Sequence, residues 1–551
     1  MTTTELQPFE VSDHVHARRW WTLAVMCLSL MLIVMDNTIL NVAIPKLMED
    51  LGATNSQVQW IIDAYTLVFA GLLLTAGSLG DRFGRRGALQ IGMALFAVGS
   101  IGSALTDSAS QLIMARGFMG IGGALIMPAT LSIITNVFRD PTERGRAIAV
   151  WAGVSGLGVA AGPIIGGVLL KHYSWHSVFW VNIPITVLAV VMIALFVPAS
   201  KDPSAPRIDV PGAIMSMLGL GTLLFGIIEG PSRGWTDSLV LASFAVGVIV
   251  IVSFIVWEMR VDEPMLDMRF FANARFSAAN GAVTLTFFAM FGSMFLLTQY
   301  WQLVRGFTPL EAAVRLIPFA ATMMVVAPMS ARVAERFGTK AVVTTGLGIM
   351  SMGMLVLSFI SVSTSTALVI VLYCVLAVGM GLTMPPATES VMGSLPPEKA
   401  GIGSAVNDTT REVGGALGVA VIGSVVSSVY TSRVGDVGPG FGVIGGALSN
   451  AKQSLANALG LAAQSNDPVG YVAAVRTSFV DALALGLRFG AVIVVGAAVF
   501  AWKFLPARGT GHHFTPVEAM TSSAAGAHAA EEESMADDLG GRSGERLVVG
   551  D

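Results

Sequence analysis

Fourteen long apolar runs, each separated from the next by a short polar segment, constrain the fold of this chain more than any other feature. A helix of about 20 mainly apolar residues crosses a bilayer core about 30 Å thick. Only 12% of the 551 residues are charged and 54% are hydrophobic, so a bilayer is the expected solvent. The sequence therefore predicts an all-α polytopic membrane protein with fourteen transmembrane helices. The runs fall at about 20–44, 57–78, 88–107, 110–134, 146–170, 178–198, 211–229, 237–257, 276–300, 309–330, 341–362, 366–388, 399–430 and 478–503.

The runs group as six, two and six along the chain. We expect a short N-terminal segment at 1–19, a six-helix bundle at 20–198, a linker with two transmembrane helices at 199–275 and a second six-helix bundle at 276–505. The stretch 431–477 is rich in Gly, Ala, Ser and Asn and is predicted as an outer loop with a short interfacial helix. The polar, acidic segment 506–551 has too little apolar surface to fold alone, which predicts a disordered tail.

The basic residues predict the orientation of the chain. If the N-terminus is cytoplasmic, 21 of the 32 Lys and Arg residues lie on the cytoplasmic side, 7 lie outside and 4 lie within spans. Basic residues are enriched in cytoplasmic loops. An even number of spans brings both termini to the same side, so we expect a multi-pass protein of the cell (inner) membrane with both termini in the cytoplasm.

Several function classes lack their sequence signature here. The two cysteines, Cys27 and Cys374, lie inside apolar runs, which favours buried thiols over a disulfide or a thiolate metal site. The sequence contains no nucleotide-binding P-loop, HExxH or CxxC motif. We therefore expect no catalytic residues, no metal and no cofactor, no nucleic-acid partner, and a proton gradient rather than ATP as the source of energy.

A short motif occurs once in each half of the chain. The segment from Gly77 to Arg86 follows the second run, and the segment from Arg332 to Lys340 follows the tenth. Aligning Asp81 with Glu335 also aligns Arg-Phe-Gly in both copies. The repeat predicts two homologous bundles with a substrate path between them.

The first copy resembles the signature loop of the major facilitator superfamily, and the chain from about residue 20 to 503 resembles its fourteen-span drug:proton antiporters of the QacA/EmrB type. The resemblance implies a major facilitator fold, two six-helix bundles plus two linker helices. It also implies that the loop is a gate on the cytoplasmic side; the alternative is a set of topology anchors alone. The predicted gating residues are Gly77, Asp81, Arg82, Gly84, Arg85 and Arg86.

Two charged residues lie inside apolar runs of the first bundle. Asp36 is in the first run, where an acid costs about 2.5 to 3.5 kcal/mol on insertion scales, so a functional role is the default hypothesis. Arg116 is in the fourth run; it cannot deprotonate, so its effect on a nearby acid must be electrostatic. Both positions match motifs of the resembled family, which implies proton coupling. The alternatives are a neutral structural acid at Asp36 and an arginine that snorkels to the outer interface.

The fifth run carries the string GxxxGPxxGG. Small residues let helices approach closely, and a proline bends the helix. Packing alone explains a GxxxG, whereas the whole string resembles the motif of exporters in this superfamily and favours efflux over uptake. Trp175, Asn182 and Pro184 match the family pattern further along. The predicted exporter-motif residues are Gly158, Gly162, Pro163, Gly166 and Gly167.

The thirteenth run holds a second charged group. Asp408, Arg411 and Glu412 share one helical face at i, i+3 and i+4 spacing. Glu412 stands where the resembled family often has glutamine. The two acids are either additional proton-coupling groups with Arg411 or members of a structural ion pair.

Together these features predict proton-coupled efflux of small lipophilic, often cationic, drugs or toxic compounds by a chain that functions as a monomer among membrane lipids. The alternatives are a proton-coupled carrier of one endogenous metabolite, and a lipid translocase or assembly factor on the same fold. Aromatic and polar side chains are candidates to line the substrate cavity, although core packing is the more common role for any single one. These candidates are Tyr65, Trp151, Gln299, Tyr300 and Trp301.

Overall fold

The computed structural model describes residues 13–51, 55–200, 209–262, 264, 266–396 and 399–506. The predicted tail at 506–551 therefore lies almost entirely outside the described residues, as does most of the segment 1–19. The described part is built from helices and contains no strand. Fourteen of its helical segments are long and apolar enough to cross a membrane, which confirms the predicted number of spans.

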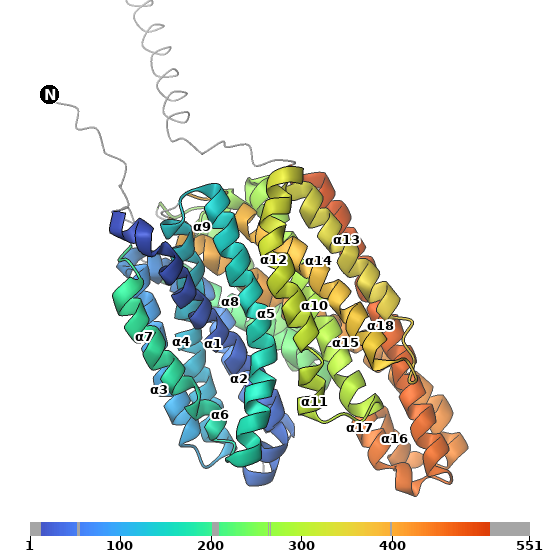
Figure 1. Cartoon of the computed structure of the whole chain (residues 1–551). Helices are drawn as coiled ribbons and strands as arrows, with labels where there is room; N and C mark the ends of the chain where they lie inside the picture. The colour runs from blue at the N-terminus through green and yellow to red at the C-terminus, as the bar shows by residue number, and fades with distance from the viewer. Residues whose placement is uncertain are drawn as a thin grey trace, which may run out of the picture. The chain divides into compact units, whose positions relative to one another are not determined.

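The first bundle contains six spans, the last of them formed by the short helix α6 and α7 together (Figure 1). Within it α1 packs against α5, and α4 packs against α2 and α3. Its helices are α1 (Asp13–Leu51), α2 (Asn55–Phe83), α3 (Arg85–Ala104), α4 (Ala109–Val137), α5 (Pro141–His172), α6 (Ser177–Trp180) and α7 (Asn182–Phe196).

The linker forms a pair of spans, α8 (Val210–Arg233) and α9 (Ser238–Glu258). α8 contacts α2 of the first bundle and α15 of the second. The short helix η1 (Met268–Ala272) leads into the second bundle.

The second bundle also contains six spans. Its helices are α10 (Ala274–Gln299), η2 (Tyr300–Val304), α11 (Pro309–Val314), α12 (Ile317–Phe337), α13 (Thr339–Leu357), α14 (Thr366–Met392), α15 (Ala400–Val437) and α18 (Pro468–Phe504). Between the last two lie η4 (Gly438–Phe441), α16 (Gly445–Gln453), α17 (Leu455–Gly460) and η5 (Ala462–Gln464).

Local chemistry fixes many helix ends. The Asp140 side chain accepts a hydrogen bond from the Glu143 amide at the start of α5, and Asp237 and Asp467 cap α9 and α18 in the same way. Gly84 joins α2 to α3 with a φ of 109°, and Gly338 joins α12 to α13 with a φ of 86°. Residues with a side chain rarely adopt such angles, so both copies of the repeated motif need glycine at this turn.

The last two spans are longer than their apolar runs. α15 continues to Val437 and α18 begins at Pro468, so both helices enter the range 431–477 that the sequence assigns to a loop. An ion pair between Arg433 of the α15 extension and Asp481 of α18, 2.6 Å apart, joins the two helices there. Two short helices, α16 and α17, occupy the remaining connection.

The bundles meet mainly where α5 packs against α12 and α2 packs against α15, and α4 also contacts α15 while α5 also contacts α11 and α14. In Figure 1 the first described turn of α1 and the end of α18 lie at the same end of the helices. We call this end, where α2 ends at Phe83 and α15 begins at Ala400, the terminal face. The opposite end, which carries α6, α16 and α17, is called the far face.

Candidate functional site

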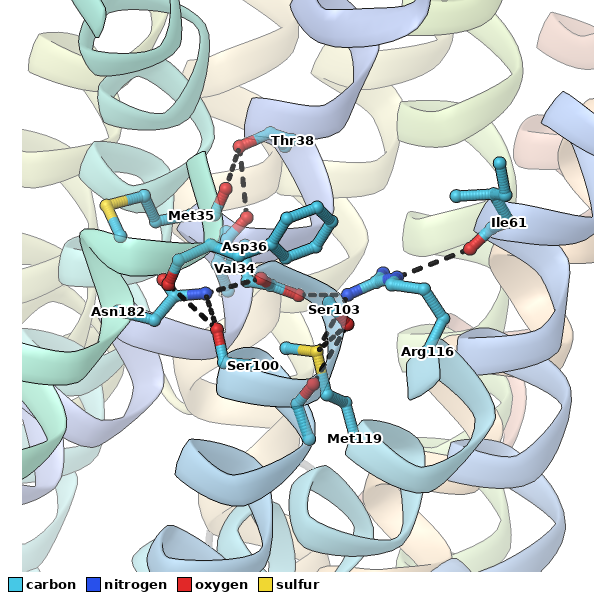
Figure 2. A network of polar contacts seen from close by, with 12 residues as sticks. Val34, Met35, Asp36, Thr38, Ile61, Ser100, Ser103, Arg116, Met119 and Asn182 are labelled. Atoms are coloured by element: carbon cyan, nitrogen blue, oxygen red, sulfur yellow. Dashed lines mark hydrogen bonds and ion pairs between the residues drawn. The ribbon is translucent and has the colours of Figure 1, made fainter. Parts of the chain in front are cut away.

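A buried ion pair lies at the centre of the first bundle (Figure 2). Arg116 of α4 and Asp36 of α1 are joined by a contact of 2.5 Å between Nη1 and Oδ2. The two side chains are 1% and 0% exposed, which shows that Arg116 does not reach an interface by snorkelling. An unpaired charge at this depth is costly, so each residue stabilises the other in the membrane.

Asn182 and Ser100 complete the polar network around Asp36. The Asn182 amide donates to Asp36 Oδ1 at 2.7 Å and lies 3.1 Å from Ser100 Oγ. The Ser100 hydroxyl in turn donates to the Phe179 carbonyl at 2.9 Å. Figure 2 shows Asn182 approaching the carboxylate from the side opposite Arg116. Both oxygens of Asp36 therefore have a donor, one from α4 and one from α7.

Arg116 is itself held from two further directions. Its Nε donates to the Ile61 carbonyl of α2 at 3.3 Å. Its guanidinium carbon lies 4.4 Å from the centre of the Tyr65 ring, a cation–π contact. Tyr65 is fully buried. The arginine thus joins α1, α2 and α4, and any shift among these helices changes its distance from Asp36.

The GxxxGPxxGG string packs α5 against the turn of α1 that carries Asp36. A Cβ atom at Gly162 would lie 2.7 Å from the Met35 carbonyl oxygen and 2.8 Å from the Ile39 nitrogen. A Cβ at Gly158 would lie 2.9 Å from Val34 Cβ, and one at Gly166 would lie 2.8 Å from Ile39 Cγ1. Pro163 lies buried between these glycines. The motif thereby sets the position of the Asp36 turn.

Gly167 of the same string faces the other bundle. A Cβ there would lie 2.7 Å from Leu310 Cδ1 in α11. Nearer the terminal face, Gly153 and Gly156 of α5 pack against α12 at Met324 and Met323. α5 is therefore both part of the Asp36 site and one side of the seam between the bundles.

The predicted gating loop contacts the second bundle through Asp81. This carboxylate accepts hydrogen bonds from the backbone amides of Gly401 (3.0 Å) and Ile402 (3.1 Å) at the start of α15. It also pairs with Arg85 at 2.7 Å, and both side chains are almost fully buried. A negative charge at a helix N-terminus is stabilised by the free amides and the helix dipole. Asp81 thus links the two bundles at the terminal face.

The other loop residues have separate contacts. Gly77 allows α2 to approach α15, because a Cβ there would lie 2.6 Å from the Gly401 carbonyl oxygen. The Arg86 guanidinium donates to the Ala194 carbonyl of its own bundle at 3.0 Å. The Arg82 guanidinium lies 5.9 Å from the centre of the Phe83 ring.

Two more ion pairs cross the seam at the terminal face. Arg144 of α5 and Glu389 of α14 approach to 2.6 Å and are mostly buried. Arg146 and Glu335, the acid of the second motif copy, lie 3.5 Å apart and are exposed. Arg144 and Glu389 are 245 residues apart in the sequence, so their pairing depends on how the bundles meet.

A second buried charged cluster lies in α15. Arg411 Nη1 is 3.5 Å from Asp408 Oδ1, and Arg411 also donates to Thr388 Oγ1 of α14 at 3.3 Å. The Arg411 guanidinium carbon lies 4.7 Å from the centre of the Trp151 ring of α5, across the seam. Glu412 is partly buried and takes no part in the Asp408–Arg411 pair.

The five candidate cavity residues divide into two groups. Tyr65 and Trp151 each lie against a buried arginine near the seam. Tyr300 and Trp301 are buried in η2 at the end of α10; the Tyr300 hydroxyl donates to the Ser361 carbonyl, and Trp301 packs against Phe307. Gln299 is partly buried beside them. The structure thus places two of the five beside the charged clusters and the other three at the far-face end of α10 in the second bundle.

The described residues contain no group of three His, Cys, Asp or Glu side chains placed to hold a metal ion. The polar network residues Asn182 and Ser100 are absent from the predicted site. Asn182 could have been included, because an amide inside an apolar run needs a partner.

Comparison with known proteins gives the family. Residues 26–419 match the model of the Major Facilitator Superfamily. The chain is 35% identical over 417 residues to the multidrug efflux pump LfrA of Mycolicibacterium smegmatis, covering 76% of this chain and 82% of that protein. It is 33% identical over 426 residues to the tetracenomycin C resistance and export protein of Streptomyces glaucescens, covering 77% and 78%.

A solved structure supports the fold. The human organic anion transporter MFSD10 aligns with a TM-score of 0.58 over 88% of this chain and 99% of its own, at 15% identity, a likeness of fold alone. The fourteen spans and the family match make this a multi-pass membrane protein. Because the matched region exceeds half of its length, the chain belongs to the Major Facilitator Superfamily.

Proposed function

We propose that this protein exports small lipophilic, often cationic, drugs in exchange for protons. Its relatives include a multidrug efflux pump and a protein named for tetracenomycin C resistance and export, which supports export as the direction and drugs as the cargo. One observation carries the proton coupling: a completely buried carboxylate, Asp36, lies within a span between a permanent cation and an amide.

The chemistry of this arrangement suits proton exchange. Arg116 keeps its charge, so a short contact with Asp36 favours the ionised carboxylate. When the helices shift and the contact lengthens, the carboxylate loses that stabilisation in a medium of low dielectric and takes up a proton. Asn182 keeps one Asp36 oxygen in place in either state, because an amide donates to both the charged and the neutral acid.

The exporter motif and the gate connect this exchange to transport. Because α5 packs on the Asp36 turn of α1 and also on α11 and α12, motion of the second bundle reaches the acid through α5. The Asp81 contact with α15 and the Arg144–Glu389 pair hold the terminal face closed. We assign this face to the cytoplasm because the basic residues gather there, which puts both termini inside the cell.

In this proposal each chain works as a monomer, with one substrate path between its two bundles and no metal or cofactor. The domain limits 20–198, 199–275 and 276–505 are part of the same proposal. The proton gradient supplies the energy, and membrane lipids supply the route by which lipophilic cargo arrives.

Efflux from loaded cells tests the function. A pump-deficient host that expresses the chain should extrude a fluorescent lipophilic cation faster than the empty host, and an uncoupler should stop the difference. Full extrusion after the gradient collapses would contradict proton coupling. No extrusion of any lipophilic dye, and no gain of resistance across a broad set of toxic compounds, would contradict drug efflux itself.

A further inference from the structure

The two charged clusters differ in their balance of charge. In the first bundle, Asp36 and Arg116 pair one to one. In α15, the single cation Arg411 stands between two acids, Asp408 and Glu412. Arg411 is committed to Asp408 and Thr388, and within the described chain Glu412 has neither a hydrogen bond nor an ion pair. With both acids ionised, this part of the membrane interior carries one negative charge that no side chain balances.

Glu412 lies in the middle of its span, on the side of α15 nearest the seam between the bundles. Its position is about 12 residues into α15, roughly 18 Å from the terminal face at 1.5 Å per residue, which is close to the middle of a bilayer core about 30 Å thick. Gly401 and Ala405 pack against Gly77 of α2, and Glu412 follows them at helical spacing, so it lies on the side of α15 that faces the first bundle. Its side chain keeps some exposed surface although α15 is buried on both sides of it at Arg411 and Gly414.

Independent observations mark the same place as a ligand site. The Trp151 ring is fully buried and faces Arg411 across the seam, yet its Nε1 has no hydrogen-bond partner. Asp408 Oδ2, on the same face of α15 as Glu412, is also buried without a partner. Buried polar atoms are normally satisfied, and exceptions concentrate at functional sites. One indole donor and one carboxylate oxygen therefore lie unused beside an uncompensated acid.

Two aromatic rings near the seam contact cationic side chains of the protein. The Tyr65 ring holds the Arg116 guanidinium at 4.4 Å, and the Trp151 ring holds that of Arg411 at 4.7 Å. A delocalised cation is attracted to such ring faces, most strongly when it is desolvated. Two aromatic rings and one unbalanced carboxylate together favour a bulky organic cation over a neutral or anionic molecule.

We propose that Glu412, beside Arg411 on the side of α15 that faces the first bundle, is the residue that makes this exporter prefer monovalent lipophilic cations. This inference rests on the proposed efflux function and names the subsite that selects its cargo. The carboxylate neutralises the charge of the bound cation, and Trp151 Nε1 is free to donate to an acceptor on it. Glutamine at this position would leave Arg411 and Asp408 electrically balanced.

Other charged groups on helices that pack against α15 are engaged elsewhere or lie beyond the subsite. Asp36 and Arg116 pair with each other, and the Arg116 guanidinium lies over the Tyr65 ring. Asp63 lies two residues before Tyr65 in α2. Further groups with partners elsewhere are Glu229 with Arg233, Glu389 with Arg144, Arg488 with Ser358, Asp81 with Arg85, Asp481 with Arg433, and Arg476 with the Leu303 carbonyl. Arg82, Arg275 and Lys503 lie within about two residues of the ends of α2, α10 and α18 at the terminal face. Asp408 and Arg411 neighbour Glu412 on its own helix.

Equilibrium binding to the purified full chain tests the proposal with two probes, the cation tetraphenylphosphonium and the neutral drug chloramphenicol. We expect Glu412→Gln to weaken tetraphenylphosphonium binding about tenfold or more, the range for one hydrogen bond or ion contact to a charged group. Chloramphenicol affinity should stay within about twofold, because that molecule gains nothing from the charge. Glu412→Asp should keep most of the cation affinity. Asp262→Asn, which removes an exposed acid outside the spans, is the matched control.

The outcomes separate the subsite from the function. Unchanged tetraphenylphosphonium affinity in Glu412→Gln overturns the proposal, and so does an equal loss of both probes, which marks a structural role. A wild-type chain that exports neutral drugs but binds no tetraphenylphosphonium overturns the subsite and leaves efflux standing. A wild-type chain that binds neither probe and exports no dye removes the proposed function and the subsite together.

Discussion

The Asp81 contact with α15 is predicted to hold the terminal face closed. Replacing Asp81 by alanine removes two hydrogen bonds from backbone amides of the opposite bundle, at 3.0 and 3.1 Å. The Arg85 ion pair is lost as well, but it lies within the first bundle and contributes nothing to the seam. The closed state should therefore lose population, while the first bundle keeps its fold.

The magnitude follows from the two amide contacts. A hydrogen bond to a charged group contributes about 1.5 to 3 kcal/mol, so two such bonds contribute at least about 3 kcal/mol. That amount changes the ratio of closed to open molecules about 150-fold. A closed population of about 99% would fall to about 40%. Asp81→Asn keeps an acceptor oxygen without the charge and should have a smaller effect, about tenfold.

Distance measurements between spin labels report this equilibrium. Phe83 ends α2 and Phe337 ends α12, and both are well exposed at equivalent turns of the two bundles. Cysteines at these two positions, in a chain whose Cys27 and Cys374 are replaced by alanine, carry the labels. Asp81→Ala should add a longer-distance population in lipid nanodiscs. Arg146→Gln is the control, because it also breaks a contact across the seam but an exposed one, worth about 0 to 1 kcal/mol.

The reasoning fails if Asp81→Ala gives the wild-type distance distribution in a chain that keeps its thermal stability. It also fails if Arg146→Gln opens the terminal face as much as Asp81→Ala does. The exposed Arg146–Glu335 pair would then hold the face closed as strongly as the buried Asp81 hydrogen bonds.

Two further predictions concern the Asp36 site. Gly162→Leu should abolish efflux at normal protein abundance, because the new Cβ would meet the Met35 carbonyl oxygen and the Ile39 nitrogen. The control Gly496→Leu, at a glycine with open space around it, should export normally. A Gly162→Leu chain that still exports would contradict the packing role of Gly162. Asn182→Ala should lower the free energy of unfolding by about 1.5 to 3 kcal/mol and should slow efflux, because it removes a hydrogen-bond donor to a buried carboxylate. Thermal or denaturant unfolding measures the change, and Ser253→Ala on the exposed side of α9 is the control. Equal unfolding free energies for the two variants would contradict the role of Asn182.

The sequence predicts the fold well because hydropathy reports each span independently of the others. The fourteen runs need no knowledge of contacts, and the Arg-Phe-Gly repeat predicts two homologous bundles; the structure shows the glycine of both copies at a positive φ. The ends of α15 and α18 are harder to predict, because their extensions beyond 430 and before 478 are polar and hydropathy does not report them. Arg433 in the first extension pairs with Asp481 of α18, a contact between residues 48 apart that composition does not reveal.

The site was predictable residue by residue but not as an arrangement. Asp36 and Arg116 were each conspicuous as charges in apolar runs, yet their pairing joins residues 80 apart. Asp81 was expected at the gate from its motif, whereas its acceptor role for the Gly401 and Ile402 amides depends on how the bundles meet. Tyr300 and Trp301 are candidates as aromatic side chains, and aromatic character does not distinguish a residue near the seam from one packed at the far-face end of α10.

Uphill transport by Asp36→Asn in proteoliposomes tests the central claim most directly. Asparagine keeps the shape of the side chain and can still contact Arg116 and Asn182, but it has no proton to exchange. With an imposed pH gradient, wild-type protein and Asp262→Asn should accumulate a lipophilic cation against its concentration gradient. Asp36→Asn should accumulate none, while exchange of labelled for unlabelled substrate continues within about tenfold of the wild-type rate. Accumulation by Asp36→Asn at the wild-type level would contradict the account and remove Asp36 from the coupling mechanism.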